Sequence, residues 1–499
     1  MEAEEARIDR WFADRADLAI ETACARVYLT GDIAYKIKKR VDLGYLDYST
    51  LALRHWALER ELRFNRAAAS DIYRAVRRVT EGPEGFLIDG PGEAVEYLLE
   101  MRRFDETAVL AARPWAVDGP LADALGREIA NLHARADRRP EGGGARALKF
   151  TIDSNAKLLR ELKPRLGSDL VEAVLAATDE AYANCQDLLD ARRTGGFARH
   201  CHADLHLGNI LLENGRPVMF DCIEFNDILS DIDVQYDLAF LLMDLDFRRR
   251  RDAAVRVLSA YLDQAARREH GGLHEGLQAL PLMMSVRAGV RAHVQAHSGD
   301  DAAATAYLRA ALDHLAPVPA KLTAVGGMSG TGKSSFARLV APGLGPAPGA
   351  VVLRTDEIRK RLAGVDHGKA LDAGAYDPDR DAQVYDALFT EAGWLIRAGR
   401  AVILDATFID PVLRQRAEAV AQRAGIAFHG VWLEAPLHLL ESRIANRQGD
   451  ASDATVETLK RQMDRDAGPG SWIRIDASGP VADSAETWIA GLKVQVALR

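Results

Sequence analysis

The sequence predicts two fold classes in succession: an α+β unit followed by an α/β unit whose parallel sheet is flanked by helices. Three observations support this expectation. Strand-like and helix-like segments alternate after residue 320, a pattern typical of a parallel sheet. Before that residue, a strand-rich segment gives way to a mostly helical one. The chain has 499 residues, and at about 150 residues per domain this length suggests roughly three folding units.

The charge and composition are those of an ordinary globular protein. Lys and Arg total 64 against 73 Asp and Glu, a formal net charge of −9, which argues against a protein whose main role is to coat nucleic acid. Hydrophobic residues make up 48% and charged residues 27% of the chain. The cysteines are far apart and lack C-x-x-C spacing, so we expect neither a zinc site nor disulfides, and a reducing cytoplasm as the compartment. They are Cys24, Cys185, Cys201 and Cys222.

No segment has the pattern of a signal peptide or a membrane span. The first residues, Met1 to Trp11, are acidic, whereas a signal peptide has a basic segment followed by an apolar one. The most apolar stretch, Leu238 to Met243, is short and is flanked by Asp237 and Asp244. We therefore expect a buried helix there and no membrane association.

In the first part of the chain, strands precede helices. We expect strands at Val27–Lys39, Gly85–Ile88 and Val95–Met101, with an amphipathic helix at Thr50–Ala69. The glycine-rich segment Asp137–Arg146 is expected to be a surface loop.

Two prolines mark the main border in the chain. They lie in Ala316–Ala320, which reads APVPA and follows an alanine-rich helical segment. Because proline cannot continue a helix, we predict one domain over residues 1–318 and a second over residues 321–499.

The second domain alternates strands with helices. Strands are expected at Lys321–Val325, Val351–Arg354, Ala401–Leu404 and Ile426–Leu433. Helices are expected at Ser334–Val340, Asp379–Ala398 and Pro411–Ala424. Ligands of such sheets bind at the carboxyl ends of the strands, so the residues that follow these strands are candidates for a binding site.

A complete phosphate-binding loop follows the first of these strands. Residues 327–334, GMSGTGKS, satisfy the pattern G-x-x-x-x-G-K-[ST] between a strand and a helix. In such a loop the backbone amides surround the β-phosphate, Lys333 reaches the β- and γ-phosphates, and Ser334 ligates Mg²⁺. The residues expected to bind ATP are Gly327, Ser329, Gly330, Thr331, Gly332, Lys333, Ser334 and Ser335.

Acidic residues follow the next two strands. Asp356 is positioned to accept the proton of a substrate hydroxyl, and Arg359 to hold a phosphate or polar group of the substrate. A helix N-cap formed by Thr355 or Asp356 is the structural alternative. Asp405 fits the acidic residue that orders Mg²⁺ behind the phosphates.

Two arginines at i, i+4 spacing follow. Arg443 and Arg447 precede the polar segment Gln448–Thr455. This pattern is typical of a mobile lid whose arginines contact the transferred phosphoryl group. A solvated helix face has the same pattern.

With these motifs, residues 321–499 resemble the small AAA-type P-loop kinases that include polynucleotide 5′-hydroxyl kinases, gluconate kinase, chloramphenicol phosphotransferase and zeta-type toxins. The resemblance implies a P-loop NTPase fold, with Asp356 as the hydroxyl-activating carboxylate and Arg443 and Arg447 as lid arginines. It does not identify the substrate.

A second group of reactive residues lies in the first domain. The sequence HADLHLGN places Asp204 and Asn209 five residues apart, and Asp221 follows twelve residues later, after two apolar strands at Ile210–Leu212 and Val218–Phe220. In the kinase arrangement, this spacing gives an Asp that activates a hydroxyl group, and an Asn and an Asp that bind Mg²⁺.

These residues resemble the aminoglycoside phosphotransferase and choline kinase group, a branch of the protein-kinase fold. The group has HGD where this chain has His202-Ala203-Asp204, a departure that leaves the reacting groups unchanged. The resemblance implies a bilobal domain, with a small lobe over residues 1–101 and a helical lobe over residues 102–315. It also implies that Asp237 is a structural brace of the catalytic loop.

The strand lysine of this domain has two candidates. Lys36 is expected to bind the α- and β-phosphates, but Lys38 lies on the same face of the strand. Glu61, or alternatively Glu59, is expected to pair with the lysine from the next helix.

The sequence gives less specific candidates for the residues that contact adenine and for the turn that covers ATP. Met101, next to Glu100, is expected at the hinge that meets adenine, and a plain buried strand is the alternative. Because Gly31 is the only glycine before the lysine strand, the turn that covers ATP must be short.

Together these patterns predict a bifunctional, ATP-dependent phosphotransferase with two Mg·ATP sites that act on hydroxyl groups of small molecules. The whole chain resembles bacterial two-domain proteins in which an aminoglycoside phosphotransferase-like domain is fused to a P-loop kinase domain. Two alternatives stay open. One half is a nucleotide-binding regulatory module, or the second half is a polynucleotide 5′-hydroxyl kinase, which the net charge of −9 disfavours.

Overall fold

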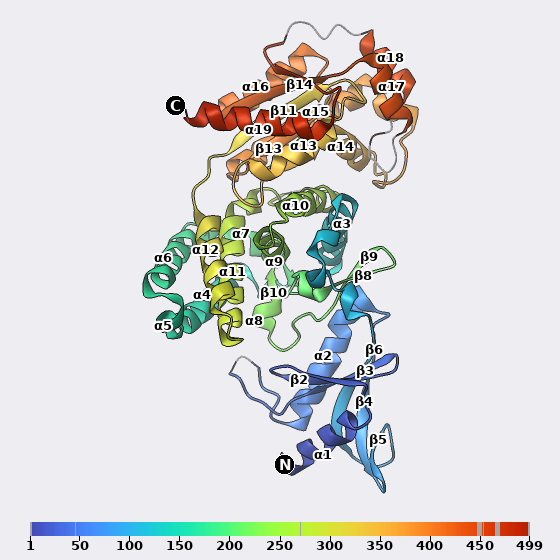
Figure 1. Cartoon of the computed structure of the whole chain (residues 1–499), viewed down its shortest axis with the longest axis vertical. Helices are drawn as coiled ribbons and strands as arrows, with labels where there is room; N and C mark the ends of the chain where they lie inside the picture. The colour runs from blue at the N-terminus through green and yellow to red at the C-terminus, as the bar shows by residue number, and fades with distance from the viewer. Residues whose placement is uncertain are drawn as a thin grey trace.

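The computed structural model describes residues 2–44, 46–269, 271–446, 452, 454–464 and 470–497. Three bodies follow one another in chain order along the longest axis of the molecule (Figure 1). The small lobe carries the N-terminus, the helical lobe lies in the middle, and the P-loop domain carries the C-terminus. The predicted fold class, a bilobal kinase-like unit followed by a parallel sheet flanked by helices, is confirmed.

The small lobe is built on a six-stranded antiparallel sheet in the order β1-β2-β3-β6-β4-β5. Helix α2 begins at the N-cap residue Thr50 and packs against β4 and β6. The elements of this lobe are α1 (Glu2–Ala13), β1 (Leu18–Glu21), β2 (Ala25–Thr30), β3 (Ile33–Lys38), α2 (Leu51–Ala69), β4 (Tyr73–Gly82), β5 (Gly85–Ile88) and β6 (Ala94–Arg102).

Two details of this lobe differ from the sequence prediction. The single strand expected at Val27–Lys39 is a hairpin of β2 and β3, because Gly31, with a φ of 53°, turns the chain between them. Strand β4 was not predicted, because arginines interrupt its apolar residues in the sequence YRAVRRVTEG.

The helical lobe surrounds α9 (Val234–Phe247), which is buried along almost its whole length. This helix contains the apolar stretch Leu238–Met243, so the expected buried helix is confirmed. The other helices are α3 (Gly119–Arg135), α4 (Gly144–Glu161), α5 (Lys163–Leu166), α6 (Ser168–Ala183), α7 (Gln186–Thr194), α8 (Asp227–Ser230), α10 (Arg251–Ala265), α11 (Leu280–His297) and α12 (Asp301–Leu315).

Two small antiparallel sheets position the motif HADLHLGN within this lobe. One pairs β7 (Ala198–His200) with β10 (Asp231–Asp233), and the other pairs β8 (Ile210–Glu213) with β9 (Arg216–Met219). The two strands expected after Asn209 are thus present, and they return the chain toward the small lobe at Asp221.

The P-loop domain contains a five-stranded parallel sheet in the order β12-β13-β11-β14-β15. The four strands and three helices expected here are present with boundaries shifted by at most two residues. The strands are β11 (Lys321–Gly327), β12 (Val351–Arg354), β13 (Val402–Asp405), β14 (Ala427–Glu434) and β15 (Ile473–Asp476). The helices are α13 (Lys333–Val340), α14 (Thr355–Leu362), α15 (Pro378–Arg397), α16 (Pro411–Ala424), α17 (Leu437–Ala445), α18 (Val456–Met463) and α19 (Val481–Ala497).

Residues 316–320 connect α12 to β11, and the predicted domain border falls in this connection. All four cysteines are free thiols in the structure. Among the described residues, no helix combines the length and the apolar character that a membrane crossing requires.

Candidate active sites

The lysine expected in the small lobe lies in a buried network of ion pairs. The Nζ atom of Lys36 is 2.7 Å from Oε1 of Glu61 and 2.8 Å from Oδ1 of Asp221. Lys38, on the same face of β3, lies 2.7 Å from the other oxygen of Glu61 and 2.6 Å from Glu224. Lys36 is therefore the lysine that contacts the Asp expected to bind Mg²⁺.

The charges in this network stabilise one another. Burial disfavours the charged form of Lys36, but Asp221 and Glu61 raise its pKa well above the ordinary value. Burial also acts to raise the pKa of Glu61, yet the two lysines lower it to about 2. Glu59, the alternative partner, is exposed and lies 3.6 Å from Nε2 of His55. Glu61 is the glutamate that contacts the lysine.

Asp204 and Asn209 contact each other on the loop between β7 and β8. The Nδ2 atom of Asn209 donates to Oδ2 of Asp204 at 2.8 Å and to its backbone oxygen at 2.9 Å. Burial acts to raise the pKa of Asp204, but His206, whose Nε2 lies 3.6 Å from Oδ2, brings it below the ordinary value. The carboxylate is thus ionised at neutral pH, and with 36% of its side chain exposed a hydroxyl group can approach it.

The buried carboxylate of Asp237 fixes this loop, as expected for a structural brace. Its Oδ1 accepts a hydrogen bond from the amide of Ala203 at 2.7 Å, and its Oδ2 accepts one from the amide of His202 at 3.2 Å. The same Oδ2 lies 3.1 Å from Nε2 of His133. Ala203 has a φ of 69°, a conformation that favours glycine and that coincides with the glycine of the HGD motif. The hydrogen bond to Asp237 offsets the strain of an alanine there.

Asp221 follows β9, and its amide donates to the hydroxyl of Tyr73 at 3.0 Å. Its side chain is 48% exposed. Because the amide nitrogen of Asn209 binds Asp204, the amide oxygen is the atom of that residue suited to a cation. A carboxylate and an amide oxygen are hard ligands that Mg²⁺ prefers, so these residues fit the ion.

The remaining nucleotide-binding candidates of the first domain lie around β6. Met101 pairs in register with Ala34 on β3, near the end of β6 that leads to the helical lobe. The carboxylate of Glu100 is occupied by Arg77, whose Nε donates to Oε2 at 2.9 Å. The hinge role of Met101 stays a prediction.

In the P-loop domain, glycines allow the loop between β11 and α13 to curl. Gly327, Gly330 and Gly332 have φ values of 139°, 87° and 88°, in the region that favours glycine. A Cβ atom on Gly330 would also lie 2.7 Å from the backbone oxygen of Leu440. The motif therefore forms the loop for which its glycines were expected.

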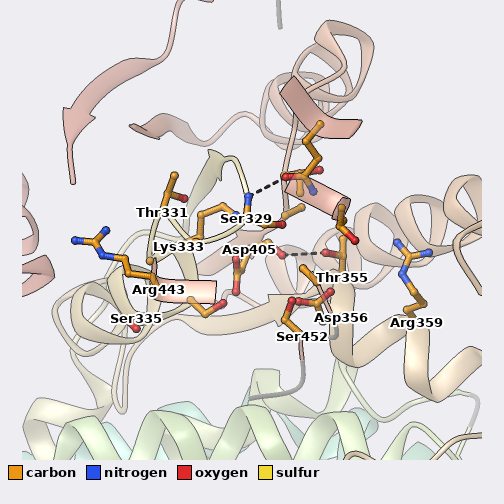
Figure 2. A pocket seen from close by; sticks show the side chains of 18 of the residues that line it. Ser329, Thr331, Lys333, Ser335, Thr355, Asp356, Arg359, Asp405, Arg443 and Ser452 are labelled. Atoms are coloured by element: carbon orange, nitrogen blue, oxygen red, sulfur yellow. Dashed lines mark hydrogen bonds between the residues drawn. The ribbon is translucent and has the colours of Figure 1, made fainter. Parts of the chain in front are cut away.

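Lys333 lies across this loop. Its Nζ donates to the backbone oxygen of Met328 at 2.8 Å, which the hydroxyl of Thr331 also contacts at 2.8 Å. The amide of Ser329 donates to Oε1 of Gln462 on α18 at 2.9 Å (Figure 2). The contact of Lys333 with a neutral carbonyl is one that charged phosphate oxygens can replace.

Arg354 links the two residues expected to bind Mg²⁺. Its Nε donates to Oδ2 of Asp405 at 3.0 Å, and its Nη2 donates to Oγ of Ser334 at 2.9 Å. Ser334 and Asp405 thus contact the same cationic group. A hydroxyl and a carboxylate are suitable Mg²⁺ ligands, and their common contact with a guanidinium group indicates a site that accepts positive charge. The residues therefore fit the ion.

Asp356 lies in the first turn of α14 and lines the cavity beside the P-loop (Figure 2). The helix begins at Thr355, and Arg354 occupies the N-cap position without a capping hydrogen bond from its side chain. The alternative that Thr355 or Asp356 is the N-cap is therefore wrong. The hydroxyl of Thr355 instead donates to the backbone oxygen of Asp405 at 3.4 Å.

The arginines expected to assist transfer lie apart. Nη2 of Arg359 is 2.5 Å from Oδ1 of Asp381. Arg443 lies on the opposite side of the cavity (Figure 2), where its Nη2 donates to the backbone oxygens of Ser478 and Gly479, both at 3.3 Å. Arg447 lies outside the described residues.

These P-loop domain residues surround one cavity of about 1050 Å³, a size that suits a nucleotide and a small acceptor. Those that line it are Ser329, Gly330, Thr331, Gly332, Lys333, Ser334, Ser335, Asp356, Arg359, Asp405 and Arg443. The helical lobe also contributes, through Pro120 and Arg256.

Sequence reasoning missed several of these residues. The one signal for Arg354 is a charged residue at the end of the apolar strand VVLR. Gln462 belongs to no motif, and Pro120 and Arg256 come from the other domain, so no local pattern connects them to the P-loop.

Two family models match the chain. The model described as the phosphotransferase enzyme family matches residues 57–273, and the model described as an AAA domain matches residues 322–469. The first match contains Asp204, Asn209 and Asp221, and the second contains Lys333 and Asp356. The chain thus joins a domain of the phosphotransferase enzyme family to a P-loop domain, the two-domain arrangement that the sequence predicted.

Sequence similarity to mycobacterial proteins extends over nearly the whole chain. Proteins of Mycobacterium tuberculosis and Mycobacterium bovis, both named as uncharacterized proteins, are 32% identical over 477 residues, which cover 92% of this chain and 92% of each relative. The chain belongs to the same family as these mycobacterial proteins.

Solved structures resemble parts of the chain. The Mycobacterium tuberculosis APS kinase CysC in complex with AMPPNP and APS is 24% identical, with 36% of this chain and 99% of that chain covered and a TM-score of 0.28. A gluconokinase from Sinorhizobium meliloti is 20% identical, with 36% and 93% covered and a TM-score of 0.27. Choline kinase from Cryptosporidium parvum is 11% identical, with 62% and 95% covered and a TM-score of 0.38.

Proposed function

We propose that the protein is an ATP-dependent phosphotransferase with two separate Mg·ATP sites, each of which phosphorylates a hydroxyl group of a small molecule. One observation carries this proposal. The same set of chemical groups occurs twice: a lysine, two oxygen donors suited to Mg²⁺, and an additional carboxylate for the acceptor.

In the N-terminal site, Asp204 binds the acceptor hydroxyl and accepts its proton. Asn209 keeps this carboxylate oriented through the hydrogen bond of 2.8 Å from Nδ2. Lys36 binds the α- and β-phosphates, and Glu61 holds its ammonium group in place. Asn209 and Asp221 hold the Mg²⁺, which when bound neutralises charge on the phosphates.

In the C-terminal site, Asp356 has the role that Asp204 has in the N-terminal site. The loop amides and Lys333 bind the β- and γ-phosphates, and Ser334 and Asp405 hold the Mg²⁺. Arg359 and Arg443 neutralise charge on the acceptor and on the phosphates, respectively. Their positions on opposite sides of the cavity support this division (Figure 2).

The chemical step is the same in both sites. The acceptor oxygen forms a bond to the γ-phosphorus while the bond between that phosphorus and the β,γ-bridging oxygen breaks. ADP leaves with the electron pair of the broken bond, and the hydroxyl proton passes to the carboxylate. Most of the catalysis then comes from positioning and charge neutralisation.

The test is transfer of the γ-phosphate from labelled ATP to sugars, aminoglycosides, nucleosides and 5′-hydroxyl oligonucleotides. Wild-type protein is compared with Asp204→Asn, Lys333→Ala and Asp356→Asn. We expect Asp204→Asn to abolish one set of products, and the other two substitutions to abolish a different set. If Asp204→Asn leaves every product unchanged, the N-terminal assignment fails. Transfer to oligonucleotides alone would identify the second domain as a polynucleotide kinase.

A further inference from the structure

The helical lobe packs against the P-loop domain through α10, which contacts β12, α13 and α14. The hydroxyl of Ser259 accepts a hydrogen bond from the amide of Val352 at 3.1 Å. Asp263 accepts one from Nη1 of Arg361 at 2.9 Å. These polar contacts between the two domains hold α10 in a defined position beside the P-loop cavity.

At the edge of this interface, the helical lobe reaches the cavity itself. Nε of Arg256 donates to Oδ1 of Asp123 at 3.0 Å, and Nη2 donates to Oδ2 at 2.5 Å. A Cβ atom on Gly119, at the start of α3, would collide with this guanidinium group. Arg256 is thus held in one orientation, with 21% of its side chain exposed and a place in the cavity lining.

A second arginine, from the P-loop domain, shares the same carboxylate. Nη2 of Arg338 on α13 lies 3.6 Å from Oδ2 of Asp123, and Arg338 also lines the cavity. Burial and the nearby charge of Arg354 lower the pKa of Arg338. Two guanidinium groups therefore flank one carboxylate at this wall. Asp123 accepts from Nε and Nη2 of Arg256, and a guanidinium group has further N–H donors from which an oxyanion can accept.

This wall and the carboxylate proposed to activate the acceptor, Asp356, line the same cavity. Glu357, which follows Asp356 at the start of α14, interacts electrostatically with both Arg338 and Asp123. In Figure 2, Asp356 lies on the side of the cavity that faces the helical lobe. A group bound at this wall and an acceptor bound at Asp356 would therefore share one cavity.

We propose that the helical lobe completes the acceptor subsite of the P-loop cavity, and that Arg256, oriented by Asp123 and next to Arg338, binds an oxyanionic group of the acceptor. This inference rests on the phosphotransfer proposed for the C-terminal site. It makes Arg256 a specificity-determining residue supplied by one domain to the active site of the other. The acceptor is then a hydroxyl compound that carries a phosphate or carboxylate group.

Inorganic phosphate is a suitable probe, because it tests the subsite without knowledge of the acceptor. Its binding is measured by calorimetry on the full chain saturated with Mg²⁺ and AMPPNP. Because Arg256 would supply a charge-assisted hydrogen bond to the phosphate, we expect Arg256→Ala to weaken phosphate binding by about tenfold or more. Asp123→Asn is expected to strengthen it, because the amide keeps an acceptor oxygen for Arg256 but removes the carboxylate charge that competes with phosphate.

Arg267→Ala is the matched control. Arg267 crosses the same interface, with its Nη1 donating to the backbone oxygen of Val365 at 2.9 Å, but it does not line the cavity. Phosphate binding is expected to be unchanged in this variant. An equal loss in Arg267→Ala would assign the effect to docking of the domains and would overturn the proposal.

Two further results would also overturn it: no phosphate binding to the wild type, or unchanged binding in both Arg256→Ala and Asp123→Asn. If Arg256→Ala no longer binds AMPPNP, Asp123→Asn alone decides the question. Failure of the wild-type C-terminal site to bind AMPPNP would instead refute the proposed function. With an acceptor in hand, Arg256→Ala should raise its KM about tenfold or more while kcat changes little.

Discussion

The two active-site regions hold their charged groups in different ways. In the N-terminal region, Lys36 and Lys38 share the buried Glu61, and each contacts a further carboxylate. In the C-terminal region, Lys333 contacts a backbone carbonyl, and Arg354 spans Ser334 and Asp405. Carboxylates thus hold the lysine of the first site, whereas the lysine of the second donates to a backbone carbonyl. The buried ion pairs of the second site are made by Arg354, with Asp405 and Glu357.

The two regions also differ in whether their residues come from one domain or from two. The N-terminal site is built from its own small and helical lobes, and Asp237 braces its catalytic loop from within. The cavity of the C-terminal site includes Pro120 and Arg256 from the other domain. The N-terminal site therefore depends on packing inside one domain, and the C-terminal site on contact between domains.

The largest expected effect comes from the carboxylate of the N-terminal site. Asp204→Asn removes the group that accepts the hydroxyl proton, and general-base catalysis typically contributes about 10²- to 10⁴-fold. We expect a loss of that size in the N-terminal activity and no change in the C-terminal one, measured as γ-phosphate transfer. Asp187→Asn, an exposed substitution on α7, serves as the control. A loss of both activities in Asp204→Asn would contradict the independence of the two sites.

The reciprocal substitution is Lys333→Ala. Loss of one preorganised charged donor typically costs about 10²- to 10³-fold in rate, so we expect a decrease of this order in C-terminal transfer only. Kinetics at saturating ATP separate this loss from weaker nucleotide binding. Normal C-terminal turnover in Lys333→Ala would refute the P-loop assignment.

A third prediction concerns the stability of the first domain. Asp237→Ala leaves buried groups on His133, His202 and Ala203 without their carboxylate partner. Removal of one member of a buried charged network typically costs about 3 to 5 kcal/mol. We expect the free energy of unfolding of the first domain to fall by about that amount in urea titrations. An exposed Asp187→Ala should change it by less than about 0.5 kcal/mol, and an equal effect of both would contradict the brace.

The smallest predicted effect lies at the junction between the two regions. Burial raises the pKa of Glu391, which contacts Arg361, to about 7. Because the folded protein binds this proton more tightly than the unfolded chain, the associated stability is present below the ordinary glutamate pKa and is lost as the pH rises through about 7.

Glu391→Gln mimics the protonated form at every pH. We expect the variant to be more stable than the wild type by about 1 to 3 kcal/mol at about pH 8, with a smaller difference at about pH 5. Urea titrations across this range measure the difference. Asp386→Asn, an exposed substitution on the same helix, should show no such trend, and a pH-independent difference for Glu391→Gln would contradict the expectation.

Regular patterns in the sequence predicted most of the fold. The alternation after residue 320 indicated the parallel sheet, and the apolar stretch Leu238–Met243 indicated the buried helix α9. Strand β4 was missed because arginines alternate with its apolar residues. The hairpin of β2 and β3 was missed because a two-residue turn around Gly31 leaves the strand pattern almost uninterrupted.

The positions of the motif residues were also largely predictable from spacing along the chain. Asn209 contacts Asp204, and its backbone oxygen accepts from the amide of Phe220, which precedes Asp221. Contacts between distant segments could not be predicted from the sequence. The choice of Lys36 over Lys38 depends on which lysine reaches Asp221 in space. The contribution of Arg256 depends on how two domains pack, for which a single sequence carries no local signal.

The central claim is that one chain holds two independent Mg·ATP sites, and the most direct measurement is the number of nucleotides bound. Calorimetric titration of the full chain with AMPPNP in the presence of Mg²⁺ gives this stoichiometry. We expect two molecules per chain for the wild type, one each for Lys36→Ala and Lys333→Ala, and none for the double variant. A wild-type stoichiometry of one, or loss of both sites in either single variant, would contradict the claim.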